Sequence, residues 1–483
     1  MRIDCPLSAA ARRDPEATAL WQDADALSFR QLDAAVAQTA ARLEAQGCSH
    51  GTYAALLMPN DRRMVVCLLA LVRLGAVACP LNTRNPPQVL RDQLQLLKTR
   101  WLIAPRETAE ALDTPGVTLL ESEALVPRGS DEQSDRHALP LESDRPAVAL
   151  FTSGSTATPK AALLTLGNLI ANARSSNQIN SLQPGDCWLL SLPLFHVGGL
   201  GILFRCLESG AEFAIARKDE PLREALARYP ISHLSLVPTQ LQRLLEERLD
   251  PEIAVRLKCI LLGGAPAPDA LVRAALQAGL PIRKTYGLTE MASQLATVPP
   301  SAPADKQLTA GRVLPGCEVK VARNGELLVR GPTRFAGYLE AGGVHCPVDA
   351  EGWFATGDLG RLDSDGYLSV LGRKDNLFIT GGENVQPEEI EAALCAIAGM
   401  AQALVVAVED REFGSRPVAF VRMTVGRVDE QELDRRLQAV LPRYKIPIRF
   451  FAWPDAAPGV TLKVSRAEFR RLATSLMAAE RQR

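Results

Sequence analysis

The sequence carries almost no net charge, because 54 lysines and arginines are balanced by 55 aspartates and glutamates. Nucleic-acid-binding surfaces rely on an excess of basic residues, so the composition gives no support for nucleic acid as a partner. The ten cysteines form no C-x-x-C pair and have no histidine partners at zinc spacing. This pattern predicts reduced thiols in a cytosolic protein rather than a disulfide framework or a zinc site.

Long hydrophobic runs are also absent. The longest apolar stretch, residues 65–81, is interrupted by Arg73 and Gly75, so it predicts a buried helix leading into a strand and no membrane span. The first six residues lack the apolar core of a signal peptide, and we therefore expect a cytoplasmic location. With 483 residues, of which 47% are hydrophobic, the chain predicts a globular enzyme of two or more domains and leaves homo-oligomerisation open.

The pattern of predicted elements changes along the chain. In the first part, helices and strands alternate, as in a doubly wound α/β sheet; a helix at 64–74, for example, separates strands at 53–58 and 76–81. A hairpin signal at Asn324-Gly325 then marks a β-rich region. Beyond residue 400, strands and helices predict a small α+β domain of about one hundred residues.

The most informative stretch is a hydroxyl- and glycine-rich loop after the apolar strand 147–151. It consists of Thr152, Ser153, Gly154, Ser155, Thr156, Ala157, Thr158, Pro159 and Lys160. Such a loop can bind polyphosphate, since glycine lets main-chain N–H groups approach, hydroxyls donate hydrogen bonds and lysine neutralises charge. A Ser/Thr-rich surface loop is the alternative, and the spacing is not that of a Walker loop. A helix is predicted from about residue 165.

Two further residues are candidates for substrate binding. His196 lies between a buried strand and Gly198-Gly199, at a predicted strand terminus, where α/β sheets bind their ligands. Arg205 follows on an apolar helix, either as a surface residue at the helix end or as a buried anion clamp. A buried arginine needs a carboxylate or phosphate partner.

The hydroxyl-rich loop resembles the signature loop of the adenylate-forming superfamily, which includes acyl-CoA synthetases, adenylation domains and luciferases. Ala157 departs from that pattern, because the family usually has Gly there; if the backbone needs a positive φ, alanine costs on the order of 1 kcal/mol. At least five motifs occur in the family's order, and they span most of the chain. They include residues 152–160, 193–199, 286–290, 349–360 and 372–387.

This resemblance implies a fold, a reaction and a set of site residues. The reaction would be the formation of an acyl-adenylate from a carboxylic acid and MgATP, followed by transfer to coenzyme A. The residues that would contact ATP are Thr152, Ser153, Gly154, Ser155, Thr156, Lys160, Gly263, Gly264, Ala265, Tyr286, Gly287, Thr289, Asp358 and Arg373. Glu290 would hold Mg²⁺, His196 would border the acyl pocket, and Lys463 would be the catalytic lysine of adenylation. The turn at Gly263 has a second interpretation as a simple strand-to-helix corner.

The resemblance also implies two domains. Residues 1–374 would bind ATP and the acyl substrate through doubly wound sheets and a β-rich subdomain. Residues 375–483 would form a small mobile α+β domain that carries Lys463 and turns about a hinge at Asp375. Gly381 and Gly382 would then line the access of coenzyme A.

Within the superfamily, less universal stretches resemble the o-succinylbenzoate–CoA ligases of menaquinone synthesis. They are residues 192–197, 235–240, 375–378 and 412–417. This likeness implies that Arg205 binds the second carboxylate or the keto-acid arm of the substrate. Another aryl- or acyl-CoA ligase and a stand-alone adenylation domain that loads a carrier protein are the alternatives. A non-catalytic member is disfavoured by the joint presence of Lys160, Glu290, Asp358, Arg373 and Lys463.

Overall fold

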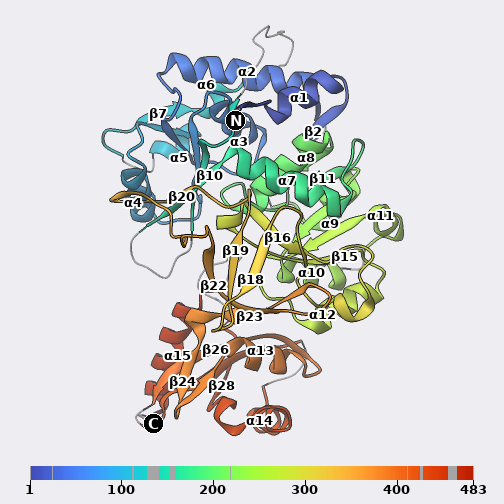
Figure 1. The fold of residues 1–483 in the computed structure, drawn as a ribbon, viewed down its shortest axis with the longest axis vertical. Coiled ribbons are helices and arrows are strands. Elements are labelled where there is room, and N and C mark those ends of the chain that lie inside the picture. Colours follow the sequence, from blue (N-terminus) through green and yellow to red (C-terminus); the bar gives the residue numbers. More distant parts are fainter. Residues whose placement is uncertain are drawn as a thin grey trace.

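The computed structural model has a large part, coloured blue to light orange in Figure 1, and a small part, deeper orange to red, at the C-terminal end. It describes residues 2–23, 25–110, 112, 114–127, 141–152, 159–217, 219–247, 249–410, 412–424, 428–454 and 465–481. Within these ranges, no helix combines the length and the apolar character needed to span a membrane.

The first of two large sheets has eight strands, in the order β21-β20-β10-β9-β5-β4-β6-β7. Its parallel strands are β4 (Tyr53–Leu56), β5 (Val77–Pro80), β6 (Trp101–Ala104), β7 (Thr118–Glu121) and β9 (Pro146–Phe151). Its antiparallel additions are β10 (Ala161–Thr165), β20 (Gly337–Glu340) and β21 (Gly343–His345). The helices of its crossovers are α3 (Arg62–Arg73), α4 (Pro87–Leu97), α5 (Arg106–Glu110) and α6 (Ser122–Leu125). A two-stranded ribbon of β1 (Arg2–Ile3) and β8 (Leu141–Glu142) lies apart.

The second sheet has thirteen strands, in the order β18-β19-β22-β23-β17-β16-β15-β14-β13-β11-β12-β2-β3. Its first-half strands are β2 (Thr18–Gln22), β3 (Asp25–Ser28), β11 (Cys187–Leu189), β12 (Glu212–Ile215), β13 (His233–Leu236), β14 (Cys259–Leu262) and β15 (Ile282–Leu288). The antiparallel strands that follow are β16 (Ser293–Thr297), β17 (Gly311–Val313), β18 (Glu318–Val321), β19 (Glu326–Arg330), β22 (Phe354–Leu362) and β23 (Tyr367–Arg373). The predicted β-rich region therefore continues this sheet, and the hairpin at Asn324-Gly325 joins β18 to β19.

Helices between and outside the two sheets complete a layered α/β architecture, as predicted. The main core joins one face of each sheet to the helices α1 (Pro6–Arg13), α2 (Phe29–Ala45), α3, α7 (Leu166–Asn180) and α8 (Val197–Ser209). The outer face of the first sheet packs on α4. The outer face of the second packs on α9 (Leu222–Arg228), α10 (Pro238–Glu246), α11 (Pro251–Arg256) and α12 (Asp269–Gln277).

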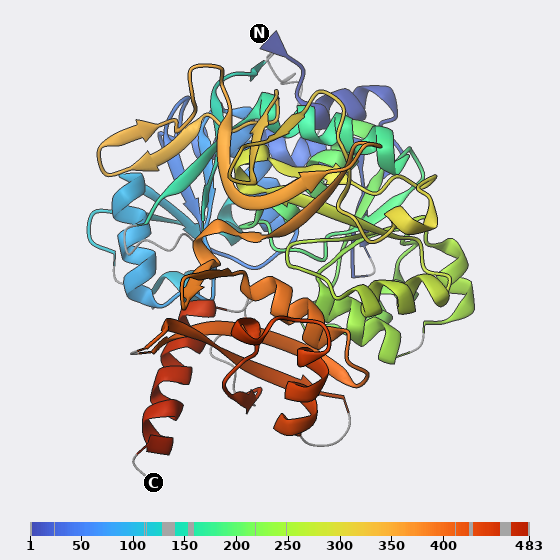
Figure 2. The same ribbon diagram turned by 60° about the horizontal axis from the view of Figure 1, so that its bottom comes forward.

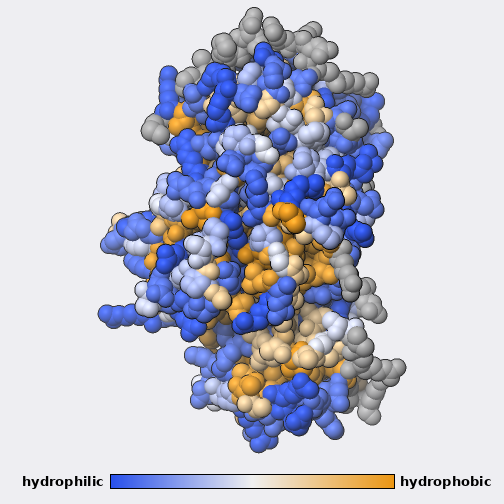
Figure 3. All heavy atoms as spheres, turned by 90° about the vertical axis from the view of Figure 1, so that its right-hand side faces the viewer, coloured by the Kyte–Doolittle hydropathy of each residue, from blue (hydrophilic) through white to orange (hydrophobic). Residues whose placement is uncertain are grey.

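The small part is a five-stranded sheet with helices on both faces, which Figure 2 shows below the larger part. Its strands are β24 (Phe378–Thr380), β25 (Glu383–Val385), β26 (Met400–Asp410), β27 (Gly414–Met423) and β28 (Phe450–Ala452). Helices α13 (Pro387–Cys395) and α14 (Glu430–Gln438) pack on one face, and α15 (Arg466–Arg481) packs on the other through Phe469 and Ala473. Hydrophobic residues remain visible along the middle and lower part of the face drawn in Figure 3.

One local prediction needs correction. The predicted helix begins at Leu166, as expected, but β10 intervenes between it and the hydroxyl-rich loop. This loop therefore joins two antiparallel strands, β9 and β10, and does not run directly into a helix N-terminus. The five residues of β10 are all buried, and tertiary packing in the sheet outweighs any local helical preference of Ala161–Thr165.

Candidate active site

The hydroxyl-rich loop is described only at its two ends. The backbone N–H of Thr152 donates to the carbonyl oxygen of Lys160 at 3.4 Å, which closes the loop at its base. The hydroxyl oxygen of Thr152 is buried and, among the described residues, has no hydrogen-bond partner. Ser153, Gly154, Ser155 and Thr156, together with Ala157, lie outside the described residues.

Lys160 lies in a cluster with Tyr338 and Glu290. Its ammonium nitrogen is 4.0 Å from the centroid of the Tyr338 ring, and the Tyr338 hydroxyl donates to the Glu290 carboxylate. Burial and the negative charge of Glu290 raise the pKa of Tyr338, so this hydroxyl keeps its proton and remains a donor. Thr289 and Glu290 share the short helix Thr289–Met291, and both are half-buried. A cation, a carboxylate and a hydroxyl thus meet at the base of the loop.

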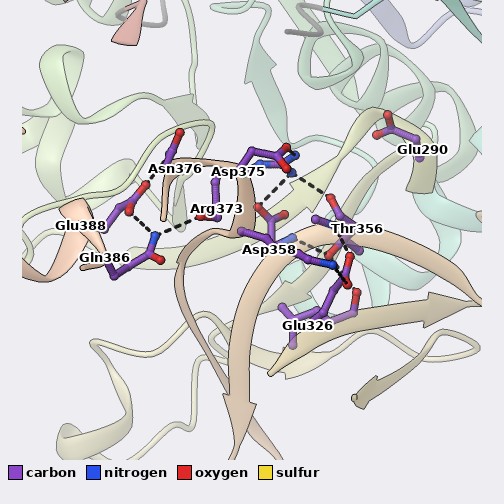
Figure 4. Close-up of polar contacts among 12 residues, drawn as sticks. Glu290, Glu326, Thr356, Asp358, Arg373, Asp375, Asn376, Gln386 and Glu388 are labelled. Atoms are coloured by element: carbon purple, nitrogen blue, oxygen red, sulfur yellow. Dashed lines mark hydrogen bonds and ion pairs between the residues drawn. The ribbon is translucent and has the colours of Figure 1, made fainter. Parts of the chain in front are cut away.

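A second cluster joins Tyr286, Asp358 and Arg373. The Tyr286 hydroxyl donates to the Asp358 carboxylate at 2.5 Å. Arg373 donates to the other carboxylate oxygen of Asp358 at 3.2 Å (Figure 4). Asp358 and Arg373 are directly opposite in the antiparallel pair β22–β23, so the sheet register brings them together. Arg373 also donates to the carbonyl oxygen of Thr356 at 2.8 Å. In Figure 4, Glu290 stands apart from this cluster.

Next to these clusters, glycines allow the backbone to pack closely against neighbouring segments. The turn Gly263, Gly264 and Ala265 follows β14, and Gly264 has a φ of +80°, a conformation that favours glycine. A Cβ on Gly263 would be 2.7 Å from the Thr285 side chain. Gly264 and Ala265 are exposed, so the backbone of this turn is accessible from outside. At Gly287, a Cβ would overlap the carbonyl oxygen of Ser293.

His196 and Arg205 are on the same helix but are not brought together. His196 is the exposed N-cap residue of α8, and its ring centroid is 4.7 Å from that of Phe195. Arg205 follows nine residues later, which corresponds to about 14 Å along a helix axis. The structure therefore separates the two residues that were predicted to contact the acyl substrate.

Arg205 is a buried cation, which excludes the surface alternative. Arg205 is only 1% exposed. Its guanidinium carbon is 5.3 Å from the centroid of the Trp188 ring, and its guanidinium donates to the Ser293 hydroxyl at 3.3 Å. Its Nε has no hydrogen-bond partner, and no described carboxylate forms an ion pair with it. Burial lowers the pKa of Arg205 to about 10. An uncompensated buried guanidinium is suited to bind an anion.

The hinge candidate and the glycine pair lie at the start of the small part. Asp375 is in the short helix Lys374–Asn376 and accepts a hydrogen bond from Arg373 at 3.1 Å. Gly381 and Gly382 form the exposed turn between β24 and β25, with φ of +55° and +88°. The expected adenylation lysine, Lys463, lies outside the described residues.

Three residues of these clusters were missed by sequence reasoning. Tyr338 is 48 positions from Glu290, and its only local signal is the preceding Gly337. Trp188 lies in β11, within the buried strand expected before His196, and nothing in the sequence distinguishes it from an ordinary core residue. Ser293 has a φ of +121°, which is rare for a residue with a side chain and leaves no trace in the sequence.

Comparison with known proteins defines the class. A model of the family described as AMP-binding enzyme matches residues 7–339, and a model of the AMP-binding enzyme C-terminal domain matches residues 389–458. The chain therefore belongs to the AMP-binding enzyme family, which confirms the predicted superfamily. More particularly, it is 35% identical over 470 residues to the 2-succinylbenzoate–CoA ligase of Geobacillus kaustophilus, covering 95% of each chain.

Structures of the o-succinylbenzoate CoA synthetase of Bacillus subtilis are also similar. The complex with its acyl-adenylate intermediate has a TM-score of 0.87 at 31% identity and covers 97% of this chain and 98% of that one. The complex with ATP and magnesium has a TM-score of 0.84 at 32% identity and covers 94% of this chain and 96% of that one. A double mutant of the same enzyme bound to its product analogue, OSB-NCoA, has a TM-score of 0.72 at 31% identity and covers 98% of this chain and 99% of that one. At similar sequence identity, this structure therefore superposes less closely on the chain than the two complexes above.

Proposed function

We propose that this protein is an ATP-dependent acid–CoA ligase whose substrate is o-succinylbenzoate. The observation that carries the proposal is the buried Arg205 without a carboxylate partner among the described residues, in a chain similar along 95% of its length to a 2-succinylbenzoate–CoA ligase. o-Succinylbenzoate has two carboxylates. One reacts, and the other needs a cation at a distance from the reaction centre.

The reaction has two steps in this proposal. The substrate carboxylate oxygen attacks the α-phosphorus of MgATP, pyrophosphate leaves, and an acyl-adenylate forms. The coenzyme A thiol, after losing its proton, then attacks the acyl carbon and AMP leaves. ATP, Mg²⁺ and coenzyme A are thus required, and the organic partners are small molecules.

The clusters supply groups suited to these ligands. Lys160 and the hydroxyl-rich loop would bind phosphate oxygens, and the Glu290 carboxylate, oriented by Tyr338, would hold Mg²⁺, which neutralises phosphate charge. Asp358 and Arg373 would bind the ribose, Tyr286 would lie against the adenine, and Thr289 would face the phosphates. His196 would border the acyl pocket at the start of α8.

In this proposal, residues 1–374 and 375–483 are two domains that turn about Asp375. One orientation brings Lys463 to the reacting carboxylate. The other brings Gly381 and Gly382 to the coenzyme A channel, which explains how one site serves two reactions.

We also infer a cytoplasmic location, because all ten cysteines are free thiols.

The test is an assay of CoA-thioester formation with MgATP, coenzyme A and a panel of acids. We expect o-succinylbenzoate to be strongly preferred over benzoate, cinnamate and medium-chain fatty acids. Activity only with another acid would overturn the substrate and retain the reaction. Pyrophosphate release without thioester would indicate a carrier-protein acceptor instead.

The contact between Tyr338 and Glu290 can be tested separately. Tyr338→Phe removes the hydroxyl that orients the carboxylate, and loss of such an orienting partner typically weakens metal binding about 10-fold. We expect the Mg²⁺ concentration for half-maximal adenylation to rise by that factor. Tyr367→Phe is the control, since that ring contacts Arg312 at 4.9 Å without involving Glu290. An unchanged Mg²⁺ requirement in Tyr338→Phe would argue against the role of Glu290.

A further inference from the structure

Gln386 is the N-cap residue of α13, and its side chain reaches back across the hinge (Figure 4). Its amide nitrogen donates to the carbonyl oxygen of Arg373 at 3.1 Å and to the Glu388 carboxylate. Arg373 precedes Asp375, whereas Gln386 and Glu388 follow it. One side-chain amide therefore bonds the two sides of the pivot to each other.

Glu388 holds this amide and links it to the start of α15. Its other carboxylate oxygen accepts from Asn376 at 2.6 Å and from Arg466 at 3.2 Å. Arg466 is the first residue of α15, and it also pairs with Glu391 of α13. The contact at the hinge is thus connected to the helix that begins three residues after Lys463.

The last strand before the hinge leaves room for this contact. Gly372, in β23, has a φ of +150°, and a Cβ there would be 2.7 Å from a carboxylate oxygen of Glu388. Only glycine at this position lets Glu388 and Gln386 approach the strand so closely. The approach is specific to the present orientation, because rotation about Asp375 would carry α13 away from β23.

The hydrogen bonds of the Gln386 side chain are partly offset by an unfavourable feature of the same amide group. The Gln386 amide oxygen is buried and has no hydrogen-bond partner among the described residues. A buried acceptor without a donor is unfavourable, which offsets part of what the two bonds of the amide nitrogen contribute. Such a balance suits a contact that must form and break in each catalytic cycle.

We propose that Gln386, supported by Glu388, is a positioning residue that holds the small domain in the orientation for adenylation. This inference rests on the proposed function. The choice of orientation rests on the TM-scores of 0.87 and 0.84 with the acyl-adenylate and ATP–magnesium complexes of the B. subtilis enzyme, against 0.72 with its product-analogue complex.

The test compares two half-reactions in Gln386→Glu. A carboxylate at this position cannot donate, and it repels both Glu388 and the Arg373 carbonyl oxygen. We expect pyrophosphate release with o-succinylbenzoate and MgATP to slow about 10-fold, the lower end of the effect of losing a hydrogen bond to a charged group. Thioester formation from supplied acyl-adenylate is expected to keep its wild-type rate. The double variant Gln386→Glu with Glu388→Gln returns a donor to the pair and should recover part of the adenylation rate.

Gln438→Glu is the matched control. Gln438 also donates to a carboxylate, that of Asp434 at 2.5 Å, but on the exposed helix α14 far from the hinge in sequence. Unchanged adenylation in Gln386→Glu, or equal loss of both half-reactions, would overturn the inference. If the wild-type protein itself lacks both half-reactions with o-succinylbenzoate, the proposed function fails instead, so the two failures are distinguishable.

Discussion

Lys463→Ala is expected to slow adenylation by about 10²- to 10³-fold, the usual effect of removing a group that stabilises charge developing in a transition state. In the proposed mechanism, Lys463 bridges the substrate carboxylate and the phosphate oxygens while negative charge moves between them. It has no part in the second step, in which the thiol attacks the acyl carbon. Thioester formation from supplied acyl-adenylate should therefore be spared.

The two rates are measured separately, as pyrophosphate release and as thioester formation from synthetic acyl-adenylate. Lys445→Ala is the control, because Lys445 is a lysine of the same small domain that pairs with Glu389 at 2.6 Å. It should change neither rate appreciably. An equal loss of both steps in Lys463→Ala would contradict the alternation of domains.

The candidate site residues that sequence reasoning named lie in continuous motifs. Asp358 and Arg373 were each identified by resemblance, and the antiparallel register of β22 and β23 brings them to opposite positions. Two contacts could not be predicted because their partners are far apart in the sequence. Tyr338 and Glu290 are 48 positions apart, and Ser293 and Arg205 are 88 positions apart. Such pairs depend on which strands become neighbours, and local patterns do not encode this.

The fold shows the same limit. The alternating helices and strands of the first half were predicted because each has its own period of apolar residues. The short strands β24 and β25 were missed, since three residues are too few to display a period. β10 was missed because its apolar residues are buried on both faces and so do not alternate with polar ones.

Arg205→Leu is expected to raise the KM for o-succinylbenzoate about 10- to 100-fold, since a hydrogen bond to a charged group contributes about 1.5–3 kcal/mol. The guanidinium is fully buried, contacts Trp188 and Ser293, and has a pKa lowered to about 10 by burial. Burying this charge is unfavourable for the free energy of folding, and an anionic ligand would offset that desolvation. Leucine removes that cost, so the variant should fold and be at least as stable as the wild type.

The substrate itself supplies the sharpest control for Arg205. An analogue that keeps the reacting carboxylate but lacks the second one cannot use the guanidinium, so its KM should be the same in the wild type and in Arg205→Leu. Arg205→Lys keeps the charge and loses the planar fork, and it should raise the KM for o-succinylbenzoate by less than leucine does. If Arg205→Leu left that KM unchanged, Arg205 would lie outside the acyl pocket. If it raised the KM for both acids equally, the residue would shape the pocket without binding the second carboxylate.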